Sequence, residues 1–102
     1  MIVEINMVPV GSGEQLSEAI AEVIDLIDQS GIDYLLTPMG TIVEGEWDEV
    51  MGLVKKCHYK MKASNARVLT NIKIDDREGT QGMLKSKVES VENKVGRKLS
   101  RT

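Results

Sequence analysis

The changing spacing of apolar residues along the chain constrains its fold more than any other feature of the sequence. Apolar residues at every second position predict strands, and apolar residues three or four positions apart predict helices. By this criterion, strands are predicted at residues 2–8, 32–36, 40–44 and 67–75. Helices are predicted from Ser12 to a stop at Ser30–Gly31, from about Glu46 to Ala63, and roughly from Thr80 to Val95.

Local signals mark the ends of these segments. Ser12 followed by Gln15 has the capping-box pattern that starts a helix. Pro9 and Gly11 are expected to end the first strand. The segment Thr37-Pro38-Met39-Gly40 separates two short strands, and it predicts a hairpin connection or a bulged link between them.

The resulting order, βαββαβ followed by a helix, is that of the ferredoxin-like split βαβ unit. This α+β fold has an antiparallel sheet with two helices on one face, here with an additional C-terminal helix. The 102 residues fit a single domain spanning 1–102. Ile2-Val3-Glu4 recurs 40 positions later as Ile42-Val43-Glu44, on the two strands that this fold places at the centre. The repeat puts Glu4 and Glu44 in equivalent positions on the same face.

Two helices on one side of a four-stranded sheet leave the other side uncovered. The residues predicted on that side are a mixture of apolar, carboxylate and amide side chains: Ile2, Glu4, Asn6, Val8, Ile42, Glu44, Leu69, Asn71 and Lys73. A face this apolar is rarely left to water, so we expect it to pack against a second copy of the chain. A polar pocket within such a sandwich is the predicted functional site.

Charge and composition exclude several classes of function. The net charge of −3 and an aromatic content of 3% argue against binding of nucleic acid. The apolar runs are too short to span a membrane, and no charged-then-apolar leader indicates secretion. The single cysteine excludes an internal disulfide and fits a reducing cytoplasm.

No motif supports catalysis, a metal site or a cofactor. Cys57 and His58 are adjacent on a predicted helix, where neighbouring side chains do not face each other. Cys57 falls on the apolar face of that helix and is expected to be buried, whereas His58 is expected to be half-exposed. Trp47 lies on the same apolar face, which favours a place in the core. One histidine and one cysteine cannot supply a His/Cys zinc set, and no nucleotide-binding or hydrolase motif occurs.

The two equivalent carboxylates, Glu4 and Glu44, allow three interpretations. As a pair they would act as acid and base in a hydrolase or isomerase, because two nearby carboxylates split their pKa values. Alternatively, they would pair across strands with Lys73 or Arg67. As a third possibility, a carboxylate accepts strong hydrogen bonds from an amine or a protonated ring nitrogen, which favours a cationic or amino-bearing small molecule.

Three stretches of the sequence resemble the thiamine-binding-protein-like (YkoF-related) family. They are Glu4-x-Asn6-x-x-Pro9-x-Gly11, residues 37–45 (TPMGTIVEG), and Arg67-Val68-x-Thr70-x-Ile72-Lys73-Ile74-Asp75-Asp76-Arg77. Together they span nearly the whole chain. The resemblance implies a ferredoxin-like domain that assembles through its sheets into homodimers or homotetramers. It also implies non-enzymatic binding of thiamine or its hydroxymethylpyrimidine part.

The resemblance also implies roles for residues on the uncovered side of the sheet and near it. Thiamine carries a permanent thiazolium charge and an aminopyrimidine, either of which Glu4 or Glu44 would complement. Hydrogen bonds to the amine and hydroxyl groups are expected from Asn6, Thr37, Thr41 and Asn71. The leading hypothesis is therefore a cytoplasmic, non-enzymatic binder of thiamine-like cations. The alternative is a structural or regulatory homo-oligomer that binds no small molecule.

Overall fold

The structure is a computed structural model that describes residues 1–11, 16–79 and 82–100. Its four strands and three helices follow the order predicted from the sequence. The elements are β1 (Ile2–Val10), α1 (Leu16–Gln29), β2 (Asp33–Thr37), β3 (Gly40–Glu44), α2 (Trp47–Lys62), β4 (Arg67–Asp75) and α3 (Met83–Val95). Within the described residues no helix is long and apolar enough to cross a membrane.

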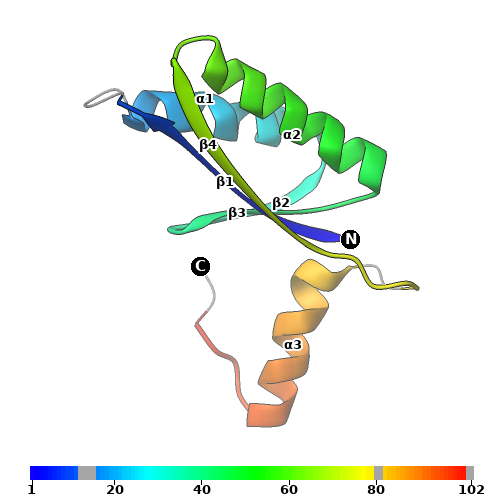
Figure 1. The fold of residues 1–102 in the computed structure, drawn as a ribbon. Coiled ribbons are helices and arrows are strands. Elements are labelled where there is room, and N and C mark those ends of the chain that lie inside the picture. The colour runs from blue at the N-terminus through cyan, green and yellow to red at the C-terminus, as the bar shows by residue number, and fades with distance from the viewer. Residues whose placement is uncertain (12–15, 80–81, 101–102) are drawn as a thin grey trace.

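The four strands form one antiparallel sheet in the order β2-β3-β1-β4. Figure 1 shows α1 and α2 together on one side of this sheet, whereas α3 projects from the other side. The predicted α+β, ferredoxin-like βαββαβ fold with an additional C-terminal helix is therefore confirmed. The central position of β1 and β3 is confirmed as well.

The end of β1 differs from the prediction. The strand continues through Pro9 to Val10, and both residues pair with β4. Pairing of β1 with β3 ends at Ile5, so Pro9 lies where β1 has a neighbouring strand on one side only. A proline is tolerated there because its missing N–H need not break a ladder. The predicted capping box at Ser12 and Gln15, and the predicted helix start at Thr80, lie outside the described residues.

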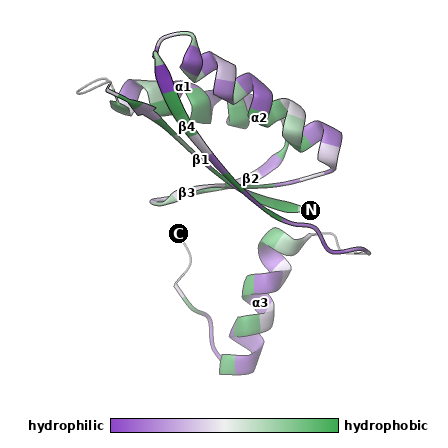
Figure 2. Cartoon of the chain, viewed as in Figure 1, coloured by the Kyte–Doolittle hydropathy of each residue, from purple (hydrophilic) through white to green (hydrophobic). Residues whose placement is uncertain are grey.

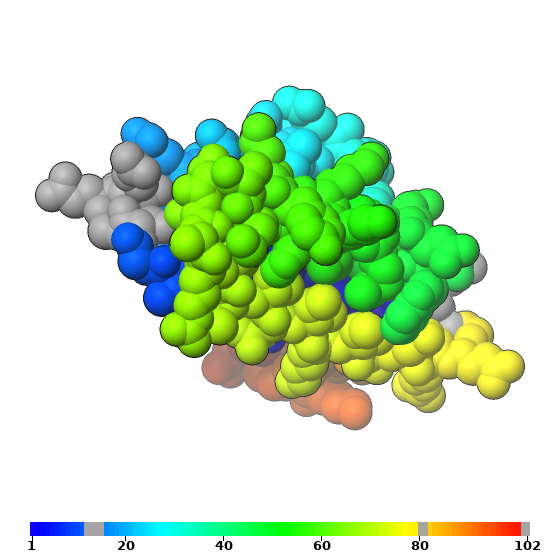
Figure 3. Space-filling view, turned by 45° about the horizontal axis from the view of Figure 1, so that its top comes forward, coloured from blue at the N-terminus to red at the C-terminus, as the bar shows by residue number. Residues whose placement is uncertain are grey.

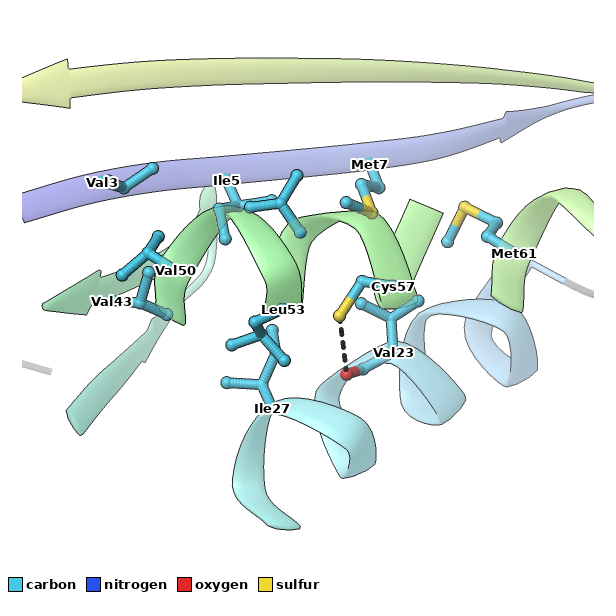
Figure 4. Close-up of a cluster of buried hydrophobic side chains, with 11 residues drawn as sticks. Val3, Ile5, Met7, Val23, Ile27, Val43, Val50, Leu53, Cys57 and Met61 are labelled. Atoms are coloured by element: carbon cyan, nitrogen blue, oxygen red, sulfur yellow. Dashed lines mark hydrogen bonds between the residues drawn. The ribbon is translucent and has the colours of Figure 1, made fainter. Parts of the chain in front are cut away.

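The core lies between the sheet and the two helices that cover it. Apolar side chains from alternate positions of β1 and β3 meet the buried faces of α1 and α2 (Figure 4). The repeated segments pair directly with each other, because Val3 lies opposite Val43 at the centre of the β1–β3 register. Both valines are fully buried, so the repeat marks the two central core positions.

The position of Trp47 contradicts the prediction that it joins the core. Its side chain is 53% exposed in the first turn of α2. The buried positions of α2 begin only at Val50 and continue to Met61. Helical spacing places Trp47 on the apolar face, but the sheet and α1 do not cover the first turn of that face.

Cys57 is fully buried, as predicted, and its thiol lies 3.9 Å from the carbonyl oxygen of Val23 (Figure 4). Burial raises the pKa of Cys57 to about 11, because the thiolate would lose its hydration. The folded state thus holds this proton more tightly than the unfolded state does. We expect the free energy of unfolding to be independent of this thiol at neutral pH and to fall as the pH rises from 9 toward 11.

Chemical denaturation of the wild type and of Cys57→Ala at several alkaline pH values tests this expectation. The variant should lose less stability between neutral and alkaline pH than the wild type does. A thiol-specific reagent should also react with Cys57 only at the rate at which the protein opens. Equal pH dependence of the two proteins would contradict the assignment.

Candidate functional site

The candidate site lies on the face of the sheet opposite α1 and α2, which we call the open face. The registers place Glu4 beside Ile42 and Lys73, Asn6 beside Asn71, and Ile2 beside Glu44. Residues that pair across antiparallel strands point to the same side of the sheet. The residues predicted for the open face are thereby confirmed to share it: Ile2, Glu4, Asn6, Val8, Ile42, Glu44, Leu69, Asn71 and Lys73.

Helix α3 is on the same side of the sheet as this face but does not cover it. Among the three helices, α3 alone contributes no residue to the buried core. Its predicted apolar stripe is only partly shielded: Leu84 and Val88 are half-buried, whereas Val91 and Val95 are exposed. Figure 2 shows hydrophobic and hydrophilic segments alternating along α3 as it projects from the sheet.

Glu44 anchors the first turn of α3. Its Oε2 accepts a hydrogen bond from the Met83 N–H at 2.7 Å, and its Oε1 accepts one from the Leu84 N–H at 3.4 Å. The residue at the N-cap position of α3 is Gly82, which has no side chain to cap the helix. A carboxylate at a helix N-terminus also interacts favourably with the helix dipole. The sequence predicted an acid–base, cross-strand or ligand-binding role for Glu44. The structure places its carboxylate at the N-terminus of α3, and the ligand role stays a prediction.

A second contact ties α3 to the sheet near the same place. Lys87 of α3 forms a salt bridge with Asp75 at the end of β4. The hydrogen bond from Lys87 lowers the pKa of the Asp75 carboxyl group, and the positive charge of Lys87 adds to this effect. Both side chains are about half-exposed, so this surface ion pair contributes little to stability.

The Glu4 carboxylate, in contrast to those of Glu44 and Asp75, does not contact α3. The Glu4 side chain is exposed on β1, the strand that lies between β3 and β4. Lys73 lies directly opposite, yet no salt bridge joins these two described residues. The predicted cross-strand pairing of Glu4 is therefore not formed, and its carboxylate stays accessible.

Two amides lie near Glu4 on the open face, one on β1 and one on β4. The Nδ2 of Asn6 donates a hydrogen bond to the Met39 carbonyl oxygen at 2.9 Å, which fixes the amide at the tip of the β2–β3 hairpin. Asn71 is exposed directly opposite Asn6. Thr37 lies in the same hairpin, where its hydroxyl donates to the Gly40 carbonyl oxygen at 2.7 Å. The register thus brings Glu4, Asn6 and Asn71 together, with Lys73 as a neighbour that the predicted site did not include.

Thr41 points to the other side of the sheet from Glu4 and Asn71, but it lines a small pocket beside α1 together with Asn6 and Thr37. It pairs with Ile5 of β1 and Leu36 of β2, and its side chain is only 4% exposed on the face that the helices cover. Because strand side chains alternate, a threonine between Gly40 and Ile42 points away from the open face. The ligand contact predicted for Thr41 therefore stays a prediction, for a pocket that includes Asn6 and Thr37 but not Glu4.

The adjacent Cys57 and His58 do not form a reactive pair. The Cys57 thiol is buried in the core, whereas the Nδ1 of the half-buried His58 lies 2.7 Å from the Thr70 hydroxyl of β4. In the part of the chain that the structure describes, no three His, Cys, Asp or Glu side chains come together in a way that could hold a metal ion.

The sequence matches a family model over most of its length. Residues 3–92 match the model described as thiamine-binding protein. The chain belongs to the thiamine-binding protein family. A UPF0045 protein of Staphylococcus xylosus is 37% identical over 97 residues, covering 89% of this chain and 91% of the relative. A UPF0045 protein of Methanothermobacter thermautotrophicus is 36% identical over 95 residues, covering 90% of this chain and 96% of the relative.

Solved structures share the fold of this family member. A protein of Thermotoga maritima, proposed to act in thiamine biosynthesis or salvage, is 30% identical with a TM-score of 0.79. The match covers 88% of this chain and 96% of that protein. A hypothetical protein of Methanocaldococcus jannaschii has a TM-score of 0.81 at 24% identity, over 88% of this chain and 93% of the other.

In this member of the thiamine-binding protein family, the open face offers the accessible Glu4 carboxylate beside two amides. A carboxylate attracts a cation, and amides both donate and accept hydrogen bonds. Apolar neighbours such as Ile42 and Leu69 supply contact area for a ring. The open face therefore combines a negative charge, hydrogen-bonding groups and apolar contact area.

Proposed function

We propose that the protein binds thiamine, or a related hydroxymethylpyrimidine or cationic small molecule, on the open face without chemically converting it. The observation that carries this proposal is the accessible Glu4 carboxylate, which no residue of the described chain neutralises, in a member of the thiamine-binding protein family. A carboxylate in this setting complements the thiazolium charge. Asn6 and Asn71, which lie directly opposite each other on β1 and β4, complement the aminopyrimidine.

The surroundings of the carboxylate support binding rather than catalysis. General acid–base chemistry by Glu4 and Glu44 requires both groups near the reacting atoms. In this structure Glu44 is engaged by two backbone N–H groups of α3, so it is not free to act together with Glu4. We propose that the protein is not an enzyme and that it acts in the cytoplasm.

Calorimetric titration with thiamine tests the binding proposal. Glu4→Gln preserves the size of the side chain and removes its charge, so the loss of a charge-assisted contact should raise the dissociation constant about ten- to hundredfold. Glu22→Gln, at an exposed position of α1 on the helix-covered side, makes the same change in net charge away from the open face and should bind as the wild type does.

The titration is repeated with thiamine phosphates and with hydroxymethylpyrimidine. Tighter binding of the pyrimidine alone would assign recognition to the amides rather than to Glu4. Absence of heat with all of these compounds, or equal affinity of the wild type and Glu4→Gln, would overturn the proposal.

A second candidate function is a homo-oligomer that uses the open face for assembly and binds no small molecule. It is favoured by the apolar side chains exposed on that face, among them Val8 (37%) and Leu69 (47%). Large apolar areas of this kind often mark protein interfaces. Native mass spectrometry of protein purified from its own cells separates the two candidates. A retained ligand would appear as added mass on each chain, whereas assembly alone would give bare multiples of the chain mass.

A further inference from the structure

The lysines and arginines of the chain are confined to its second half. All 13 of them lie after residue 54, whereas 11 of the 16 acidic residues lie before it. Residues 1–54 supply β1, α1, β2, β3 and the first half of α2, so the charged side chains of these elements are all acidic. The net charge of −3 therefore conceals a strongly acidic half of the chain and a basic one.

A groove of about 590 Å³ lies between α1 and α2, on the side of the sheet opposite the open face. Figure 3 shows α1 and the residues that follow it, in blue to cyan, next to the green α2 at the surface of the molecule. Leu26, Ile32 and Leu53 give the groove an apolar lining. Most of the other lining residues are exposed, so the groove is open to solvent.

One end of this groove is negatively charged. Asp48 and Glu49, both exposed in the first turn of α2, line it together with the residues that end α1. Neither carboxylate forms a salt bridge with another described residue. Helix α1 has no basic residue in its last turn, so the negative end of its dipole adds to the charge of the carboxylates. This end of the groove therefore attracts a cation.

Gly52, which also lines the groove, is a glycine that the fold itself does not require. It lies inside α2, one turn from Asp48, and its φ is not in the left-handed region. A Cβ added at Gly52 would meet no atom within 4 Å. Glycine inside a helix is less stable than alanine, so alanine would both fit and stabilise α2. The effect of the missing side chain falls on the groove, which it keeps open for close approach.

The shape and chemistry of the groove indicate what would occupy it. Pockets for small molecules usually enclose most of the ligand, which an open groove does not do. A segment of a larger partner needs no such enclosure. Lysine and arginine side chains lay their aliphatic stems on apolar surface while their charged heads reach carboxylates. The groove offers both kinds of contact side by side.

We propose that the groove between α1 and α2 is a docking site for a basic segment of another protein. A lysine or arginine head of that segment lies beside Asp48 and Glu49, and its apolar side chains cross α2 over Gly52. The groove lies on the helix-covered side of the sheet, so the proposal does not depend on the binding of thiamine at the open face.

Fluorescence anisotropy with a labelled hexapeptide of alternating lysine and leucine tests the proposal. The wild-type protein should bind this peptide saturably, with one peptide on each chain. Two control peptides separate the two kinds of contact. Replacing every lysine with glutamate, or every leucine with serine, should raise the dissociation constant at least about tenfold, because each change removes one of the two complementary features.

Substitution of Gly52 distinguishes a docking role from a structural one. Gly52→Ala should raise the thermal midpoint of unfolding, since it removes a glycine from a helix, and yet weaken binding of the peptide. Gly52→Leu places a larger side chain in the groove and should raise the dissociation constant at least about tenfold, with the helical circular dichroism retained. A residue that only supports the fold would not change stability and binding in opposite directions.

Removing the charges of the groove gives a second measurement. Asp48→Asn/Glu49→Gln should raise the dissociation constant of the lysine–leucine peptide about tenfold. Glu18→Gln/Glu89→Gln is the matched control, because it removes two exposed carboxylates that do not line the groove. Thermal unfolding of each variant confirms that it folds.

Several results would overturn the proposal. One is the absence of saturable binding to the wild type, and another is equal affinity for the lysine–leucine peptide and its two controls. An unchanged affinity in Gly52→Leu would place the peptide outside the groove. An equal loss of affinity in the two double variants would show that the peptide responds only to the overall charge of the protein.

Discussion

Ile27→Ala is expected to lower the free energy of unfolding by about 2–5 kcal/mol, the largest effect of any substitution considered for this protein. Ile27 is 1% exposed on the buried face of α1, where Figure 4 shows it beside Leu53 of α2. Truncation to alanine removes apolar contacts and leaves a cavity that close-packed neighbours fill only in part. Because small domains are stable by only about 5–15 kcal/mol, a loss of this size removes a large share of the total.

Urea denaturation followed by circular dichroism measures this loss. Ile20→Ala is the matched control, because it makes the same chemical change in the same helix at a side chain that is 38% exposed. Its cost should be well below that of Ile27→Ala, since half-exposed methyl groups lose less burial. Similar midpoints for the two variants would show that α1 does not pack on the sheet as described.

Glu44→Ala is expected to loosen α3 while leaving the rest of the fold intact. The carboxylate caps the Met83 and Leu84 N–H groups, and a lost helix cap typically costs about 1 kcal/mol. That cost falls on α3 alone, because α3 adds no residue to the buried core. An opening equilibrium that shifts by this amount should speed hydrogen exchange in the first turn of α3 about fivefold.

Hydrogen exchange measured by mass spectrometry or NMR resolves the effect by segment. Protection of β1 and α2 should remain unchanged in Glu44→Ala. Glu46→Ala is the matched control, because Glu46 stands at the N-cap position of α2 without a side-chain capping bond. Unchanged exchange at Met83 and Leu84 in Glu44→Ala would contradict the capping role.

The same variant bears on the ligand role that the sequence suggested for Glu44. If Glu44 acts only as a helix cap, thiamine affinity should be unchanged in Glu44→Ala and reduced in Glu4→Gln. A loss of affinity in both variants would mean that α3 or Glu44 itself contributes to the site. The two substitutions thus distinguish the role of Glu44, which caps α3, from that of the accessible Glu4.

Much of the fold is predictable because it depends on local periodicity. The bounds of β3 and β4 agree with the sequence prediction, and those of α2 agree within one residue. Alternation alone also assigns the faces of the sheet, since Val3 and Val43 are buried while Glu4 and Glu44 share the other side. The same alternation separates Thr41 from Ile42, so the position of Thr41 on the helix-covered face follows from the sequence alone.

Other features depend on contacts between distant residues. The cap that Glu44 provides joins positions 39 residues apart, and nothing near Glu44 or Met83 in the sequence signals it. Helical spacing could not show that the first turn of α2, with Trp47, is left uncovered. Nor could the apolar stripe of α3 show that the helix projects away from the core.

The sequence by itself determined which residues form each strand and helix and which side of the sheet each strand residue faces, because periods of 2 and 3.6 are properties of a single segment. Only the tertiary structure decided which of two equivalent carboxylates remains accessible. Glu4 and Glu44 occupy repeated positions, but the path of the chain after β4 brings α3 to Glu44 and leaves Glu4 free. The physical reason is that a helix N-terminus needs hydrogen-bond acceptors, and the acceptor it uses is the one that the folded chain places within reach.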